Sequence, residues 1–308
     1  MWLNPEVQKK IEWRDGDILV SVPPKSGTTW SMNIAYQLRE GGKGDFEDLY
    51  EEIPWIEFVE HPGQTTEEIV EKLDAMPTTK RRIFKTHAGP DGFPYFDPAG
   101  QGDGSGSTKD VKYIVVLRNP DEAIGSFYPF LSRHRPEFLE LWGIPEKAFT
   151  FPDFESFYRD WISANDMDKR IFKFLHEWWP KRNNSNVLFL HYNGMKKDHE
   201  GSVKKFSNFL GYDYDPSGAE WKRILEYTSF SWMKRNEQKF ECAKLAPVPL
   251  LRRGSMLRRG ESGLADLDGV TEEISRSIAS RGREVLEDED AFWFLYKGSS
   301  PLTQTPDI

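Results

Sequence analysis

One short segment near the amino terminus limits the folds that this chain can adopt. The apolar run "DILVSV", from Asp17 to Val22, leads into "PPKSGTTW" and then into a helical pattern that stops at residues 41–42, a pair of glycines. A short apolar run predicts a buried strand, and glycine after a periodic segment predicts the end of a helix. The segment therefore predicts a strand, a loop and a helix in direct succession.

The same alternation continues along the chain. Apolar runs typical of buried strands recur at residues 81–87, 112–120 and 186–192, and helical patterns follow the last two at 121–133 and 195–211. Strands that alternate with helices indicate a parallel sheet. We therefore expect an α/β chain with a P-loop-containing three-layer fold, in which helices flank a central parallel β-sheet.

The composition of the chain limits the kinds of partner that we expect it to bind. The chain has 308 residues and a formal net charge of −9, whereas nucleic-acid-binding proteins are normally basic, so we expect no nucleic acid partner. The single cysteine, Cys242, cannot form an internal disulfide, which fits a reducing compartment. The sequence has neither a signal core nor the roughly 20 apolar residues of a membrane span. We expect a cytoplasmic protein with no membrane partner, folded as a single domain over residues 1–308.

The loop after the first strand has the chemistry of an anion site. The free N–H groups and the dipole at a helix amino terminus favour negative charge. Gly27 permits close approach of the backbone, Thr28 and Thr29 offer hydroxyl groups, and Lys25 adds a positive charge at the loop's mouth. A glycine-rich turn with a solvated lysine is the plain structural alternative.

The position of the lysine bears on the reaction. The common nucleotide loop, G-x-x-x-x-G-K-[ST], places its lysine after the second glycine and uses the hydroxyl residue to hold magnesium. That spacing is absent here, and no acidic strand end stands out as a metal partner. The sequence therefore disfavours a magnesium-dependent ATPase or kinase.

The loop also resembles that of a known family. "PKSGTTW" is similar to the 5′-phosphosulfate-binding loop of cytosolic sulfotransferases, and further similar segments follow in family order over about residues 15–265. Residues 266–308 match the family poorly. These further segments are "IPWIEF" (53–58), "KTH" (85–87), "LRNPDEAIGSFY" (117–128), "LFLHYNGMKKD" (188–198), "YTSFSWM" (227–233) and "LRRGESG" (257–263).

The resemblance implies a reaction and its co-substrate. The donor would be 3′-phosphoadenosine 5′-phosphosulfate (PAPS), the product adenosine 3′,5′-bisphosphate (PAP), and the acceptor a small-molecule alcohol, phenol or amine. The sulfuryl group would move by in-line transfer without a metal. Two alternatives are an ATP-dependent P-loop phosphotransferase and a non-catalytic nucleotide-binding protein. The presence of both Lys25 and His87 argues against the second alternative, because a protein that only binds a nucleotide would not need a base.

Three residues carry the catalytic roles that the resemblance implies. Lys25 would stabilise charge on the departing phosphate, Lys85 would stabilise the transferring sulfuryl group, and His87 would be the general base. His87 follows Lys-Thr at the carboxyl end of a predicted strand, where open α/β sheets bind ligands. The other histidines are expected to lack that placement: His61, His134, His176, His191 and His199.

The resemblance also assigns the donor contacts. Trp30 and Phe230 would stack on the adenine, Tyr192 and Thr228 would add polar contacts, and Arg118 with Ser126 would hold the 3′-phosphate. "RRG" occurs twice, and we choose Arg258–Gly260 over residues 252–254 because only that copy has the G-x-x-G spacing. The full set expected to bind the donor is Lys25, Ser26, Gly27, Thr28, Thr29, Trp30, Arg118, Ser126, Tyr192, Thr228, Phe230, Arg258, Arg259 and Gly260.

The acceptor side is expected to be apolar and aromatic, as suits a phenol or a polycyclic alcohol. A long glycine-rich segment, residues 87–107, is expected to form a lid, with a flexible surface loop at 99–108. The family's dimer motif is not intact near residues 268–277, which leaves the oligomeric state open. The candidate lining residues are Trp55, Phe58, Tyr95, Phe127, Tyr128, Phe130 and Trp142.

Overall fold

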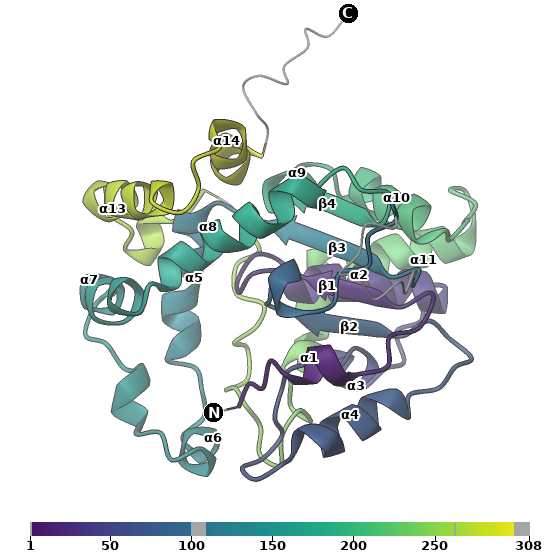
Figure 1. Ribbon diagram of the computed structural model, residues 1–308, viewed down its shortest axis with the longest axis horizontal. Helices are drawn as coiled ribbons and strands as arrows, with labels where there is room; N and C mark the ends of the chain where they lie inside the picture. The colour runs from purple at the N-terminus through teal and green to yellow at the C-terminus, as the bar shows by residue number, and fades with distance from the viewer. Residues whose placement is uncertain (1, 100–108, 262, 299–308) are drawn as a thin grey trace, which may run out of the picture.

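The computed structural model describes residues 2–99, 109–261 and 263–298, so nearly all of the loop expected at 99–108 lies outside the described residues. Four parallel strands form a sheet with the order β2-β1-β3-β4 (Figure 1). The predicted strands and the α/β parallel-sheet architecture are confirmed. The strands are β1 (Ile18–Ser21), β2 (Ile83–Thr86), β3 (Lys112–Leu117) and β4 (Val187–His191).

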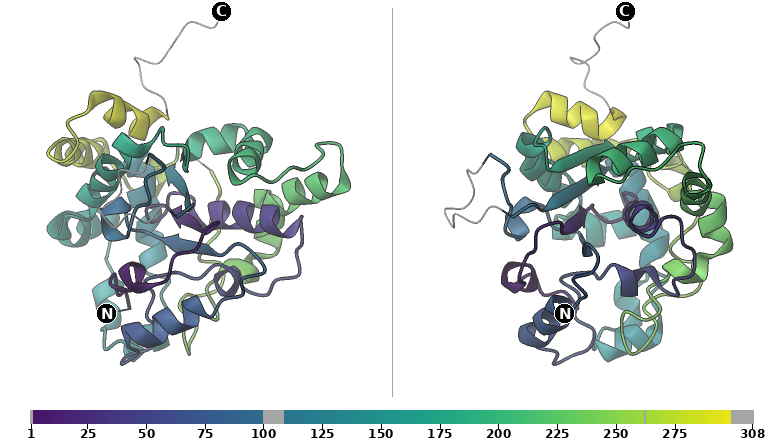
Figure 2. Two further views of the ribbon diagram at one scale, coloured as in Figure 1. Left: turned by 45° about the vertical axis from the view of Figure 1, so that its right-hand side comes forward. Right: turned by 90° about the vertical axis from the view of Figure 1, so that its right-hand side faces the viewer.

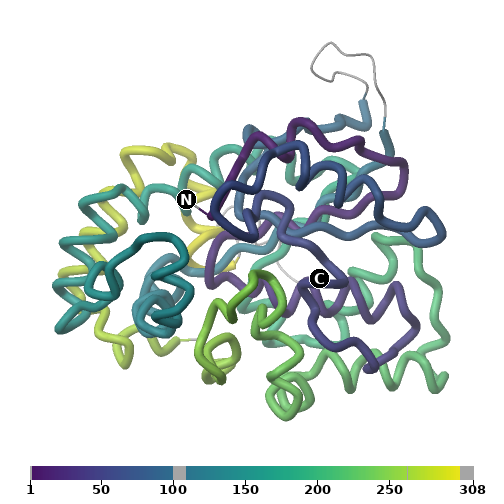
Figure 3. The backbone as a smooth tube through the Cα atoms, turned by 90° about the horizontal axis from the view of Figure 1, so that it is seen from below, coloured from purple at the N-terminus to yellow at the C-terminus, as the bar shows by residue number. Residues whose placement is uncertain are grey.

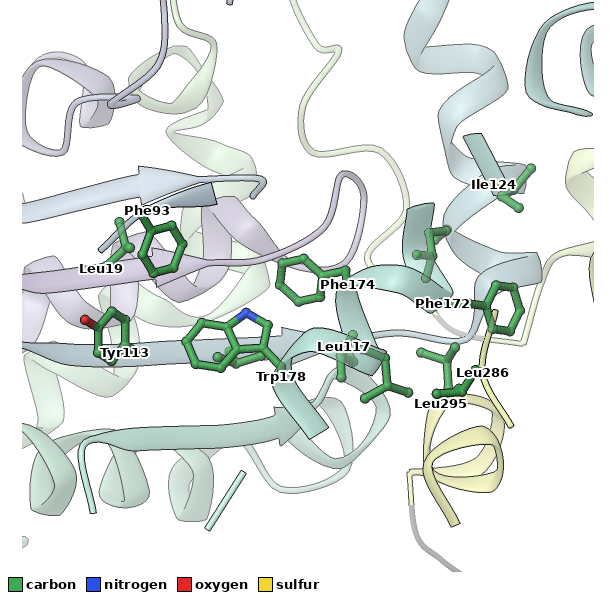
Figure 4. Close-up of a cluster of buried hydrophobic side chains, with 14 of the residues drawn as sticks. Leu19, Phe93, Tyr113, Leu117, Ile124, Phe172, Phe174, Trp178, Leu286 and Leu295 are labelled. Carbon is green, nitrogen blue, oxygen red and sulfur yellow. The ribbon is translucent and has the colours of Figure 1, made fainter. Parts of the chain in front are cut away.

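Successive side chains of each strand point to opposite faces of the sheet. Both faces are buried along β1 and β2 and nearly all of β3, whereas β4 is half-buried at its centre. On one face, Tyr113 of β3 lies beside Trp178 of α8 (Met167–Trp178), with 5.6 Å between ring centroids (Figure 4). On the other face, Val20 and Ile114 belong to the apolar cluster that includes Ile34 of α2 (Thr28–Glu40). Helices on both faces of a sheet give the three layers expected from the sequence.

The other helices surround these layers. Figure 2 shows α13 and α14 close to α8, and from below (Figure 3) they gather with the teal segment of α6 and α7 on one side of the molecule. The remaining helices are α1 (Val7–Lys10), α3 (Leu49–Glu52), α4 (Thr66–Asp74), α5 (Pro120–Leu131), α6 (Pro136–Leu141), α7 (Phe154–Phe157), α9 (Tyr192–Lys197), α10 (His199–Leu210), α11 (Ala219–Thr228), α12 (Phe230–Arg235), α13 (Glu272–Arg283) and α14 (Glu289–Lys297). Within the part of the chain that the structure describes, none of these helices has the length and apolar character of a membrane span.

The helix expected over residues 195–211 is two helices in the structure. Asp198 has φ −136° and ψ 85°, which ends α9, and its carboxylate accepts a hydrogen bond from the N–H of Gly201 at 2.9 Å, which caps α10. Aspartate is favoured at a helix amino-terminal cap because it satisfies an N–H group that the helix leaves free. The break separates Lys196 from His199, and both line the cavity described below.

The sheet order sets where a ligand can bind. β1 lies between β2 and β3, so the connections from β1 and β3 leave the sheet at a point where the strand order reverses. Open α/β sheets bind ligands at the carboxyl ends of strands at such a point. The loops after β1 and β3 carry Lys25 and Arg118, and the Nη1 of Arg118 donates to the carbonyl oxygen of Lys25 at 3.1 Å.

Candidate functional site

A cavity of about 990 Å³ opens at the carboxyl ends of the strands. Its walls come from the loop after β1, the ends of β2 and β3, α5, α9, α12 and residues 250–268. Among the described residues, the cavity brings together every catalytic and donor-binding residue expected from the sequence except Ser26 and Thr228, which are fully buried beside it. Residues far apart in the sequence therefore meet in one place.

The loop after β1 presents unpaired backbone donors to this cavity. The N–H of Ser31 donates to the carbonyl oxygen of Gly27, whereas the amides of Thr28, Thr29 and Trp30 have no acceptor among the described residues. Gly27 has φ +99°, and a Cβ there would lie 2.8 Å from the Cδ2 of Tyr192. Residue 27 must therefore be glycine, because another residue would strain the backbone and collide with Tyr192. The free amides form a cradle suited to a phosphate.

Lys25 is held over an aromatic ring at the mouth of the loop. Its Nζ lies 4.0 Å from the centroid of Phe130 on α5, and its backbone is left-handed, with φ +62°. Burial, together with the positive charges of Arg118 and Arg258, lowers the pKa of Lys25 to about 7. A bound anion would raise that pKa again, so the ammonium form is the one that a negatively charged ligand selects.

A second buried lysine lies at the end of β2. Residues 54–56 pair with β2 through a bridge between Trp55 and Lys85, and the Nζ of Lys85 lies 3.0 Å from the centroid of the Trp55 ring. Burial lowers the pKa of Lys85 well below its usual value. The indole face therefore holds Lys85 at the cavity wall, and the nearby charge of Glu57 opposes the effect of burial on the pKa of Lys85.

His87 is fixed in one tautomer. Its Nδ1 lies 2.6 Å from the carbonyl oxygen of Val22, an acceptor, so Nδ1 carries the proton and Nε2 keeps its lone pair. Burial and the charge of Lys85 hold the pKa of His87 well below its usual value, which keeps the ring neutral. The carboxylate of Glu57 accepts hydrogen bonds from the N–H of His87 at 3.2 Å and from the Oγ1 of Thr86 at 3.0 Å, which fixes this strand end.

Aromatic and polar side chains form the wall beyond the loop. The Nε1 of Trp30 donates to the carbonyl oxygen of Thr228 at 2.8 Å, and the hydroxyl of Thr228 donates to the carbonyl oxygen of Ile224 at 2.7 Å. His199 contacts the same hydroxyl through Nε2 at 2.9 Å and lies 5.8 Å from Trp30. Thr228 thus positions Trp30 and His199 instead of facing the cavity itself.

Three arginines gather on the opposite side of the loop, and each has a carboxylate partner. The Nε of Arg118 donates to Glu122 at 2.9 Å, and its guanidinium lies 4.7 Å from the centroid of the Tyr192 ring. Arg258 forms a two-bond ion pair with Asp268, and the Nη1 of Arg259 donates to the same carboxylate at 3.3 Å. Arginine is suited to bidentate contact with phosphate as well as with carboxylate.

The family model for the sulfotransferase domain matches residues 15–278 of this chain. The chain belongs to the sulfotransferase family. Human sulfotransferase 1E1 is 32% identical over 76% of this chain and 71% of the relative, and mouse sulfotransferase 1A1 is 30% identical over 75% and 71%. The chain is accordingly a PAPS-dependent sulfotransferase, with PAP as the product that the donor leaves behind.

Solved structures share the fold of this sulfotransferase. The crystal structure of mouse sulfotransferase SULT7A1 complexed with PAP has a TM-score of 0.67 and 23% identity, covering 96% of this chain and 93% of that chain. Retinol dehydratase in a complex with retinol and PAP also has a TM-score of 0.67, with 19% identity, 91% coverage of this chain and 84% of that chain. At these identities the similarity establishes the fold.

The sulfotransferase cavity continues into an aromatic part. Among the expected lining residues, Trp55, Phe127, Phe130 and Trp142 line it, joined by Phe149 and Trp161, which the sequence did not single out. Phe58, Tyr95 and Tyr128 do not line it. Phe58 is 3% exposed and belongs to the core cluster on the α2 face of the sheet.

The two tyrosines lie outside the cavity for identifiable reasons. Tyr95 packs on Tyr113, on the α8 face of the sheet, and its hydroxyl accepts a hydrogen bond from Asn184 at 2.8 Å. Tyr128 faces away from its neighbour on α5 and packs on Phe157 with 5.2 Å between ring centroids. Adjacent aromatic residues on one helix point in different directions, so composition could not separate them.

Some residues that line the cavity of the sulfotransferase were not predicted from the sequence. Lys196 donates to the carbonyl oxygen of Gly260 and lies 5.8 Å from the centroid of Phe230. The capping Asp198 was the available signal for the helix break that brings His199 beside Trp30. His191 also ends a strand, contrary to the expectation that only His87 does so, but both of its ring nitrogens contact backbone groups.

The two copies of "RRG" in the sulfotransferase lie in different places relative to the cavity. Arg258, Arg259 and Gly260 all line the cavity. Of the first copy, Gly254 lines it, whereas Arg252 does not and pairs at 3.5 Å with the exposed Glu146. Within residues 2–99, 109–261 and 263–298, no group of three or more His, Cys, Asp and Glu side chains is arranged to hold a metal ion.

Proposed function

We propose that this sulfotransferase transfers the sulfuryl group of PAPS to a hydroxyl or amine of a largely apolar small molecule, with His87 as the general base. The single observation that carries the proposal is the contact of His87 Nδ1 with the carbonyl oxygen of Val22, because it leaves Nε2 with a free lone pair in the cavity. A neutral imidazole within reach of an acceptor hydroxyl can take its proton.

The donor would be held by groups from several elements. The free amides at the start of α2 would bind the 5′-phosphate, Trp30 and Phe230 would stack on the base, and the arginines would bind the 3′-phosphate. The cradle fits such a group, since the Cβ of any other residue at Gly27 would collide with Tyr192. When bound, PAPS supplies an activated sulfuryl group whose leaving group is a phosphate.

The two buried lysines would supply the positive charge that the reaction needs. Lys25, next to the phosphate cradle, would stabilise charge on the leaving phosphate, and Lys85, one residue from Thr86 and two from His87, would stabilise charge on the transferring group. Ammonium groups in these places would take the role that magnesium has in kinases. We therefore propose that the transfer proceeds without added metal.

The aromatic part of the cavity would bind the acceptor. Trp55, Phe127, Phe130 and Trp142 give it flat apolar walls, which suit a phenol or a polycyclic alcohol. Retinol dehydratase, which shares this fold, has been solved with retinol and with androsterone, two large apolar molecules. We infer an acceptor of that general character, with its reacting oxygen or nitrogen directed to His87.

Two measurements test the proposal. The first compares the shift in melting temperature caused by PAP with that caused by ATP; stabilisation by PAP is expected, and stabilisation by ATP alone would instead support the phosphotransferase alternative. The second incubates the protein with isotopically labelled PAPS and a panel of phenols, sterols, alkyl alcohols and amines, in EDTA, and detects sulfated product by mass spectrometry. Product that requires added magnesium would contradict the metal-free transfer.

A further inference from the structure

Asp268 occupies the arginine side of the donor cavity. It ends the short 3-10 helix η7 (Asp266–Asp268), and its carboxylate pairs with both terminal nitrogens of Arg258 and with Arg259. Its side chain is 7% exposed, whereas the side chains of Arg258 and Arg259 are 34% and 41% exposed. The carboxylate is thus buried behind two arginines that face the cavity.

The carboxylate also lies against the helix that is expected to bind the 3′-phosphate. A Cβ added at Gly125 of α5 would lie 3.2 Å from the Cβ of Asp268, and the next residue, Ser126, lines the cavity together with Asp268. A phosphate bound between Ser126 and the arginines would therefore meet the guanidinium groups that Asp268 now holds. A carboxylate and a phosphate can each offer two oxygens that accept two parallel hydrogen bonds from one arginine.

We propose that Asp268 competes with the 3′-phosphate of the donor and product for Arg258 and Arg259, and that it yields these arginines when the nucleotide binds. The inference rests on the proposed role of these arginines in donor binding. A phosphate monoester carries close to two negative charges and three acceptor oxygens, so it displaces a single carboxylate. The competition lowers the affinity for PAP as well as for PAPS, and so favours release of the product.

Calorimetric titration of the full chain with PAP and with adenosine 5′-monophosphate tests the inference, because only PAP carries the 3′-phosphate. Asp268→Asn removes the charge and keeps the shape of the side chain. We expect it to bind PAP about tenfold more tightly than the native chain, as expected for a change of ~1.4 kcal/mol, and to bind adenosine 5′-monophosphate within about twofold of the native chain.

The matched control is Asp266→Asn. Asp266 lies on the same short helix, carries the same charge and is exposed, and among the described residues its carboxylate has no ion-pair partner. Loss of this charge is expected to leave the affinity for both nucleotides within about twofold. A comparable gain in PAP affinity in both variants would show that the gain comes from the change in net charge alone, and would overturn the inference.

Other outcomes are equally decisive. Unchanged or weaker PAP binding by Asp268→Asn would mean that Asp268 positions the arginines for the phosphate, which contradicts competition. Asp268→Ser, checked by its melting temperature, serves the same purpose if the asparagine variant does not fold. A native chain that binds ATP but not PAP would instead overturn the proposed function, so the two failures are distinguishable.

Discussion

The cavity has a polar part at the loop after β1 and an aromatic part around Phe127 and Trp142, which we propose bind the donor and the acceptor and name accordingly. These two parts are built in different ways. The donor part uses backbone amides and charged side chains, and hydrogen bonds such as Trp30 to Thr228 and Arg118 to Glu122 fix several of its members. The acceptor part uses ring faces, with Phe127 stacked on Phe130 at 5.8 Å and Phe149 against Trp161 at 6.5 Å. Directional bonds tie the donor part to single residue types, whereas apolar packing tolerates exchange. Substitutions should therefore separate nucleotide binding from acceptor choice.

His87→Ala should have the largest effect on turnover. Loss of a general base lowers kcat by about 10²- to 10⁴-fold, while the affinity for PAP should stay within about twofold because the nucleotide is expected to contact other groups. Product formation by mass spectrometry and calorimetric titration give the two values, with the exposed His61→Ala as the control. If His87→Ala lost PAP binding but kept a normal turnover, the assignment of His87 as the base would be refuted.

Gly27→Ala should affect the donor part next most strongly. The added Cβ meets Tyr192 at 2.8 Å in a backbone conformation of φ +99°, and strain of this kind costs about 1–3 kcal/mol. We expect PAP to bind at least about tenfold more weakly, since 1.4 kcal/mol corresponds to a factor of ten. Gly63→Ala has similar backbone strain, at φ +88°, and nothing within 4 Å of the added atom. An equal loss of PAP affinity in both variants would contradict the argument that the contact with Tyr192 causes the loss.

The affinity for PAP should fall as the pH rises from 7.5 to 9. Lys25 has a pKa of about 7 in the ligand-free chain, and a bound anion raises it, so binding takes up a proton in this range. Proton linkage predicts a loss of about tenfold, and Lys25→Arg should flatten the profile because arginine stays charged. Titrations in two buffers of different ionisation enthalpy measure the proton uptake. A profile that is unchanged in Lys25→Arg would exclude Lys25 as its source.

The same pKa predicts the opposite trend for the stability of the ligand-free chain. Because the pKa of Lys25 in the folded chain lies below the ordinary lysine value of 10.5, the unfolded chain binds more protons between pH 7 and 10.5. The contribution of Lys25 to the free energy of unfolding therefore increases as the pH rises through this window. Urea unfolding of the native chain and of Lys25→Met at pH 7 and pH 9 isolates this contribution.

Phe127→Leu should have the smallest effect, confined to the acceptor part. The smaller side chain removes part of a flat wall, and the loss of about 1 kcal/mol of apolar contact would raise KM for an aromatic acceptor roughly fivefold. The affinity for PAP should not change. Tyr128→Phe, at the neighbouring position that faces away from the cavity, should alter neither value. A changed PAP affinity in Phe127→Leu would show that the two parts are coupled.

The sequence predicted the donor part far better than the acceptor part. Lys25, His87 and Arg118 each follow a short apolar strand, and parallel strands bring their carboxyl ends to one edge, so position along the chain determined position in space. Tyr95 and Tyr128 could not be excluded from the acceptor part, because an aromatic residue fits a core and a cavity wall equally well. The direction of each ring depends on packing that no local pattern encodes.

The break between α9 and α10 and the placement of Asp268 show the same limit. A helical pattern ran through Asp198, although its capping side chain ends one helix and starts the next. Asp268 lies outside the segments whose resemblance to the family was evident by eye, although the family model extends to residue 278 and so corrects the expected limit at 265. Asp268 meets Arg258 because η7 returns to α5 beside Gly125. Contacts that depend on such a return are set by tertiary structure.

The left-handed backbone of Lys25 places conformational strain on the residue that carries the charge of this loop. A φ of +62° costs a lysine roughly 1 kcal/mol that glycine would not lose. The loop's path and the loop's charge are therefore separable, since glycine at this position would keep the cradle of amides and discard the amine. Lys25→Gly would therefore relax the loop and keep the amides, and it would remove the ammonium group that we propose stabilises the leaving phosphate. Conformation and charge thus make opposite demands on a single residue of this loop.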